Sequence, residues 1–190
     1  MRRLCSILAI VSCTVLSSAS LAQTDDVKAR TERARAAAAE FGKRLIGELQ
    51  KVMAQGGPVA AIEVCNLEAP QIAAEVSREN GMTVRRTSLK LRQPANKPDA
   101  WELAQLQSFE QRKAAGEAPA AIEIGEFVES GGKRLFRYMK AIPTAELCLT
   151  CHGSAIAPEV SERLETLYPA DGATGFKAGD LRGAFTITQE

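Results

Sequence analysis

Histidine is almost missing from this chain: its 190 residues include one, His152. A single histidine excludes a site built from two imidazoles of the same subunit. No pair of carboxylates stands out as a general acid and base, so the sequence predicts no enzyme. A strong charge of either sign is also missing, since the formal net charge is +1 at pH 7 and the basic residues form no stripe. A chain of this kind is not expected to bind nucleic acid.

A long apolar run is missing as well, although the N-terminus is apolar. Two arginines follow Met1, residues 4–16 are mostly apolar, and a small-x-small cleavage site ends at Ala22. This run is shorter than the roughly 20 apolar residues that cross a membrane. It predicts a signal peptide over residues 1–22 and a single periplasmic domain over residues 23–190 with no membrane span. A lipoprotein anchored at Cys13 is the less favoured alternative, because its apolar run is unusually short.

Cleavage of the signal peptide leaves three of the five cysteines, Cys65, Cys148 and Cys151. Cys148, Cys151 and His152 form a C-x-x-C-H sequence, the pattern that attaches a c-type haem. Two thiols at this spacing on one helical turn reach both vinyl groups of one porphyrin, and the histidine that follows lies under the iron. The motif therefore predicts one covalent haem c per chain, with His152 as an axial ligand.

The same cysteines allow other readings. A C-x-x-C pair also serves as a disulfide, a redox switch or part of a zinc site. With Cys65 the motif makes a Cys3His set, but the adjacent residues Cys151 and His152 are poorly placed for one tetrahedral zinc ion.

The sequence limits which group occupies the second axial position of such a haem. The candidates are Cys65, Met53, Met82, Met139, a lysine, water or no ligand. No methionine follows Cys151, which counts against the common arrangement of small electron-carrying cytochromes. Cys65 lies on the apolar stripe of a helix just before Pro70, and a spare thiol is hazardous in an exported haem protein. A lone cysteine is also commonly an inert core residue, so the residues alone leave this position open.

Hydrophobic periodicity and turn signals predict the elements of one domain. Helices are expected over residues 25–55 and from residue 58 to about 80, broken at Pro70, and over residues 99–115, where Asp99 and Glu102 resemble a capping box. Strands are expected over residues 83–91, 121–128, 133–142 and 181–188, the middle two forming a hairpin. Short helices are expected at the haem motif and after Pro158. This order predicts an α+β fold with an antiparallel sheet and a haem at one end of the sheet.

Several blocks of sequence resemble a bacterial and cyanobacterial family of single-haem domains that also occurs as the sensory ectodomain of some receptors and kinases. The blocks are AIEVC at 61–65, RTSLK at 86–90, LRQPANKPD at 91–99, FRYMK at 136–140, CLTCHG at 148–153 and YPAD at 168–171, followed by Gly175 and Gly179. The resemblance extends over residues 41–188. Gln93 departs from the family pattern, in which an asparagine follows the arginine.

The resemblance implies a PAS-like antiparallel sheet with N-terminal helices and a C-terminal haem-attachment helix. It implies haem c with His152 and Cys65 as axial ligands to the iron and with Cys148 and Cys151 as the thioether attachment points. Four basic residues in the same blocks are candidates to bind the haem propionates, because guanidinium and ammonium groups pair with carboxylates. They are Arg86, Lys90, Arg92 and Arg137.

The function expected on these grounds is redox or small-gas sensing by a periplasmic haem protein, in which the iron loses or protonates Cys65 and the helix that carries Cys65 shifts. The partners expected are a small gas or a separate redox protein, and a homodimer through the N-terminal helix is expected by analogy with PAS-like domains. The alternative is a periplasmic electron-transfer cytochrome, in which the iron keeps both axial ligands.

Overall fold

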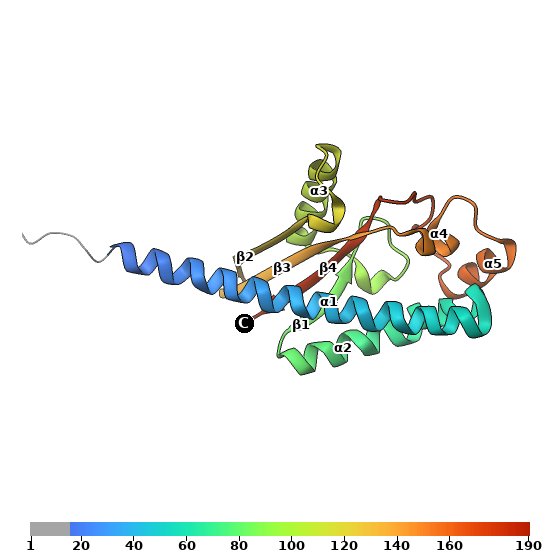
Figure 1. The fold of residues 1–190 in the computed structure, drawn as a ribbon, viewed down its shortest axis with the longest axis horizontal. Helices are drawn as coiled ribbons and strands as arrows, with labels where there is room; N and C mark the ends of the chain where they lie inside the picture. The colour runs from blue at the N-terminus through green and yellow to red at the C-terminus, as the bar shows by residue number, and fades with distance from the viewer. Residues whose placement is uncertain (1–15) are drawn as a thin grey trace, which may run out of the picture.

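The first element is a long helix that reverses on itself. The computed structural model describes residues 16–190, so most of the predicted signal peptide, and Cys13 with it, lies outside the described residues. Helix α1 (Leu16–Glu63) is interrupted at Gly57, which has φ 73° and ψ −172°. That backbone conformation is essentially confined to glycine. The interruption lies where the sequence predicted a break, and Figure 1 shows the chain turning back there into a second helical arm.

The returning arm contains a second irregularity. Residues Val64–Glu68 form a π-helix, and helix α2 (Ala69–Asn80) continues from it. Pro70 has no backbone N–H and cannot donate a hydrogen bond within the helix. Just before it, the wider π-helical turn pairs the amide of Ala69 with the carbonyl of Val64. The predicted break before Pro70 is therefore a π-helical turn, and Cys65 lies within it.

Four antiparallel strands form the sheet in the order β1-β4-β3-β2. They are β1 (Thr83–Thr87), β2 (Glu123–Ser130), β3 (Lys133–Pro143) and β4 (Leu181–Gln189). Strands β2 and β3 form the expected hairpin, with Ser130 opposite Lys133. The last strand lies in the middle of the sheet, between the first strand and the hairpin. The α+β architecture with an antiparallel sheet is confirmed.

Strand β1 is shorter than predicted. It ends at Thr87 instead of residue 91, because the side-chain hydroxyl of Ser88 forms the hydrogen bonds at the next position. The Ser88 hydroxyl lies 2.8 Å from the carbonyl oxygen of Arg182 and 3.2 Å from the amide of Lys90, which turns the chain away from the sheet.

The two faces of the sheet are covered by different helices. On one face α1 packs Phe41 and its run of buried alanines against Tyr138 and Ile187. On the other face α3 (Ala100–Ala114) packs Phe109 against Met139. Alternate residues of β3 thus enter opposite cores, as the period of two in a strand requires. The capping box predicted at the start of α3 is present.

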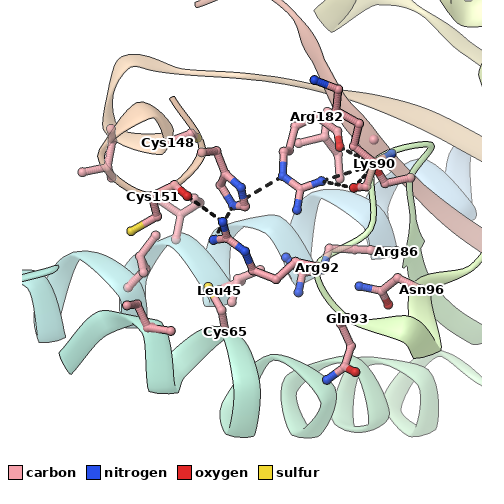
Figure 2. A pocket seen from close by; sticks show the side chains of 18 of the residues that line it. Leu45, Cys65, Arg86, Lys90, Arg92, Gln93, Asn96, Cys148, Cys151 and Arg182 are labelled. Carbon is pink, nitrogen blue, oxygen red and sulfur yellow. Dashed lines mark hydrogen bonds between the residues drawn. The ribbon is translucent and has the colours of Figure 1, made fainter. Parts of the chain in front are cut away.

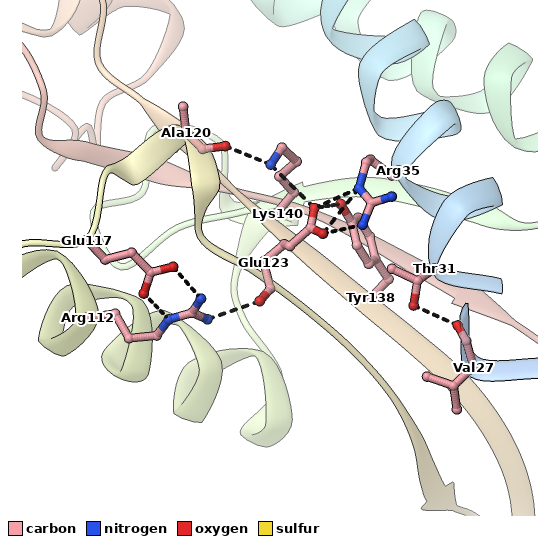
Figure 3. Close-up of polar contacts among 9 residues, drawn as sticks. All are labelled: Val27, Thr31, Arg35, Arg112, Glu117, Ala120, Glu123, Tyr138 and Lys140. Carbon is pink, nitrogen blue, oxygen red and sulfur yellow. Dashed lines mark hydrogen bonds and ion pairs between the residues drawn. The ribbon is translucent and has the colours of Figure 1, made fainter. Parts of the chain in front are cut away.

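A polar network ties α1 to the hairpin. The guanidinium of Arg35 on α1 pairs with Glu123, whose carboxylate also accepts a hydrogen bond of 2.7 Å from the Tyr138 hydroxyl (Figure 3). Lys140 approaches the same carboxylate at 3.4 Å. The hydrogen bond from Arg35 lowers the pKa of Glu123 to about 2, so the carboxylate is ionised at neutral pH.

The C-x-x-C-H segment follows the hairpin directly. It forms helix α4 (Glu146–His152), and helix α5 (Pro158–Leu167) comes after it. Val160 and Leu164 of α5 pack on Ile62 in the returning arm. These contacts hold α4 and α5 at the end of the sheet, beside the turn of the helical hairpin (Figure 1).

Candidate haem site

A cavity of about 190 Å³ lies between α1, the π-helical turn, the end of β1 and helix α4. Its apolar side is formed mainly by α1, with Leu45, Leu49 and Met53, while the thiols of the motif lie on α4. Figure 2 shows the remaining wall, where several arginine side chains converge. An apolar chamber with a few charged groups at one side is the usual form of a cofactor site.

The cavity brings together all four residues that the sequence singled out as a haem site. Cys65 reaches it from the π-helical turn, and Cys148, Cys151 and His152 reach it from α4. All three thiols are free and half-buried. Burial raises the pKa of Cys151 above its ordinary value. Within residues 16–190, no three acidic, cysteine or histidine side chains are grouped closely enough to hold one metal ion.

The imidazole of His152 is held in one tautomer. Its Nδ1 lies 2.7 Å from the carbonyl oxygen of Ala173 and must donate to it, because a carbonyl only accepts. Nε2 then carries the lone pair, and it faces the guanidinium groups of Arg182 at 3.4 Å and Arg92 at 3.5 Å. Burial, reinforced by these two cations, lowers the pKa of His152 to about 2. The imidazole is therefore neutral, as a metal ligand must be.

Arg92 fixes the motif helix to the loop that follows α5. It forms an ion pair of 2.8 Å with Asp171, and both side chains are nearly buried, at 7% and 11% exposure. The same guanidinium donates to the carbonyl oxygen of Cys151 at 2.6 Å. Removal of either charge leaves the other buried without a partner, which is costly.

The loop of residues 168–180 also supports α4 directly. The amides of Gly175 and Phe176 donate to the carbonyls of Gly153 and His152, both at 2.9 Å. The ring of Phe176 stands edge-on to the imidazole, with 6.2 Å between the centroids. This loop fixes the position of the carbonyl of Ala173 that orients His152, which is the kind of outer contact that a metal-binding histidine requires.

The basic residues predicted to bind propionates are divided by the sheet. Arg86, Lys90 and Arg92 line the cavity. Arg137 does not, because it projects from the opposite face of β3 and pairs with the buried carboxylate of Glu102 at 3.1 Å. Its assignment as a propionate candidate is wrong for this reason: position 137 faces the core under α3, where Glu102 needs a counter-charge.

The three methionines are also distinguished by their positions. Met82 and Met139 belong to the two cores of the sheet, with 9% and 0% exposure. Met53 lines the cavity together with Cys65. Of the thioether candidates for the second axial position, Met53 is the one that the fold places at the site.

Two functional contacts were not anticipated from the sequence. Arg182, at the start of β4, donates to the Ser88 hydroxyl at 3.2 Å and reaches His152. Asp171 supplies the counter-charge for Arg92. Arg182 is the one charged residue of β4, which was a signal in the sequence, whereas the pairing of residues 92 and 171 is set by tertiary structure alone.

The residues at this cavity fit a haem c. Two thiols at the spacing of the attachment motif, a neutral imidazole whose Nε2 carries the lone pair, a third thiol and an apolar lining share one space. The fold and the site define an α+β domain with a cysteine–histidine cavity at the end of an antiparallel sheet.

The chain belongs to the Tll0287-like family, whose model matches residues 15–189. It is similar to the crystal structure of the cyanobacterial heme-protein Tll0287, with 25% sequence identity and a TM-score of 0.53. The match covers 80% of this chain and 94% of that one. No curated protein matches the chain. Among the helices of residues 16–190, none has the length and apolar character needed to cross a membrane.

Proposed function

We propose that this protein is a periplasmic c-type haem protein that responds to redox state or to a small gas. The observation that carries the proposal is the cavity that collects three thiols and the neutral imidazole of the sole histidine in the sequence. Membership of the Tll0287-like family and similarity to a solved heme-protein support it. When bound, haem supplies a redox-active iron with two axial positions.

The residues of α4 have separate tasks in this proposal. Cys148 and Cys151 would attach a haem by adding their thiols to its vinyl groups. His152 would present Nε2 to the iron, while the carbonyl of Ala173 accepts the hydrogen bond from Nδ1 and orients the ring. Arg92 keeps α4 in place through its bond to the carbonyl of Cys151.

Cys65 would be the second protein ligand to the iron of a bound haem, and it is the residue whose bond we expect to change. It sits in a π-helical turn, an irregular segment of the kind that recurs at functional sites. Helix α2 continues from that turn and is joined to β1, where the amide of Val84 donates to the Ser77 hydroxyl at 2.9 Å. A change in the bonding of Cys65 would therefore shift a helix that is anchored to the edge of the sheet. This path favours sensing over plain electron transfer, in which both axial ligands stay in place.

The test compares the parent protein with Cys65→Ala after export from a host that matures c-type haems. The parent is expected to show a thiolate charge-transfer signal when ferric and to bind CO when reduced. Cys65→Ala should lose the thiolate signal and bind CO without competition. The matched control, Met53→Leu, removes the thioether candidate that lines the cavity and should leave the spectra unchanged. If Cys65→Ala has the spectrum, potential and CO binding of the parent, the assignment of Cys65 fails.

Reduction separates the two functional classes in the same experiment. Binding of CO by the reduced parent, which requires that Cys65 leave the iron, supports sensing. Retention of both ligands through the redox cycle, with no CO binding, would instead identify an electron-transfer cytochrome.

The location is tested by the mass of the exported protein, which should begin at Gln23 if the signal peptide is removed after Ala22.

A further inference from the structure

The cavity wall carries an unbalanced charge. Four cationic side chains line it, Arg86, Lys90, Arg92 and Arg182, and no aspartate or glutamate among the described residues does. A buried cation is stable only when it is paired or well hydrogen-bonded. The partners of each cation therefore show which of them is free for an anionic ligand.

Three of the four have polar partners in the protein. Arg92 is neutralised by Asp171 at 2.8 Å. The ammonium of Lys90 donates to the carbonyl oxygen of Thr174 at 3.0 Å and lies 4.8 Å from the centroid of the Phe176 ring. Arg182 donates to the Ser88 hydroxyl at 3.2 Å, to the carbonyl of Lys90 at 3.3 Å and to Nε2 of His152 at 3.4 Å, but it has no carboxylate partner among residues 16–190.

Arg86 is the exception. Within the described part of the chain its guanidinium makes no hydrogen bond or ion pair, and it lies over the face of Phe41, with 5.6 Å to the ring centroid. Burial lowers its pKa below the ordinary value for arginine, and Cys65 and Tyr168 only partly offset this effect. Figure 2 shows Arg86 in the same cavity wall as Arg92 and Arg182, and the charges of Arg86 and Arg92 both lower the pKa of Arg182.

We propose that Arg86 binds a propionate carboxylate of the haem and that Arg182 supplies the second cation at this end of the cavity. This inference rests on the proposed function. A haem carries two propionates, and a guanidinium offers two parallel N–H donors that match a carboxylate. Arg92 has a different role, because two of its guanidinium N–H groups already donate to Asp171. Arg92 is therefore a positioning residue for α4. A bound haem would thus be held by cations from β1 and β4 and by the thiols of α4.

The test uses the haem-loaded protein and the propionate bending band in its resonance Raman spectrum, which reports hydrogen bonds to the carboxylates. Arg86→Met should shift this band and lower the melting temperature. Arg86→Lys keeps the charge but loses the fork, so its band should shift by a smaller amount. Arg85→Met is the matched control, because Arg85 precedes Arg86 on β1 but pairs with Glu102 on the opposite face of the sheet. It should leave the band unchanged.

The outcomes separate this inference from the proposed function. A parent protein without covalent haem contradicts the proposed function itself. A parent with haem, together with an Arg86→Met band identical to that of the parent, overturns the role of Arg86 and leaves the function standing. If Arg86→Met yields no loaded protein, Arg86→Lys decides: a shifted band supports the contact, and an unshifted band refutes it.

Discussion

The ion pair between Arg92 and Asp171 gives the sharpest prediction of stability. Replacement of Arg92 by glutamine leaves the Asp171 carboxylate with 11% exposure and one remaining hydrogen bond, from the amide of Ala173 at 2.8 Å. It also removes the donor to the carbonyl of Cys151. Breaking a buried pair by removing one partner costs about 3–5 kcal/mol. For a chain of this length, each kcal/mol shifts Tm by roughly 2–4 °C.

The assay is urea unfolding of the haem-loaded protein, followed by far-ultraviolet circular dichroism. Arg92→Gln should lower the free energy of unfolding by about 3 kcal/mol or more. Arg92→Gln with Asp171→Asn should recover part of the loss, since no buried charge then lacks a partner. Arg163→Gln, which breaks a more exposed pair with Glu63, should cost less than about 1 kcal/mol. A loss below about 1 kcal/mol for Arg92→Gln, with no recovery in the double variant, would refute the reasoning.

Two further predictions concern α1 and its contacts. The pKa of Glu123 is lowered to about 2 in the folded protein, against about 4.3 when unfolded, so its contribution to stability is present above pH 4.3 and is lost as the pH falls toward 2. The difference in unfolding free energy between the parent and Glu123→Gln should therefore shrink over that range, and a constant difference would contradict the assignment. Gly57→Ala should destabilise by about 1–3 kcal/mol because of its backbone angles, whereas Gly47→Ala, on an exposed and open helical position, should stabilise by about 0.5–1 kcal/mol. Thermal unfolding checks both signs, and equal effects would contradict them.

Local signals in the sequence were sufficient for most of the fold. The break at Gly57, the capping box at Asp99 and the antiparallel hairpin each depend on residues a few positions apart, and all three are present. The thiols and His152 could be assigned to one site because the attachment motif has a fixed spacing. Their location at the end of the sheet follows from the short connection between β3 and α4.

Long-range contacts set the details that the sequence did not predict. Strand β1 stops early because Ser88 bonds to the carbonyl of Arg182, which lies 94 positions away in the chain. Arg137 does not line the cavity, because it pairs with Glu102 on the other face of the sheet. Such choices depend on which face of a strand a residue occupies, and a one-residue change of register reverses that face.

Covalent attachment of haem at Cys148 and Cys151 is the central claim, and the most direct measurement of it is made on denatured protein. The exported parent, matured in a host that attaches haem c, is extracted with acidified organic solvent, and the chain is then examined by mass spectrometry and by its pyridine haemochrome spectrum. One haem should stay on the chain in the parent and be extracted from the variant with both Cys148→Ala and Cys151→Ala. A parent chain that carries no haem, or loses it to the solvent, would contradict the account.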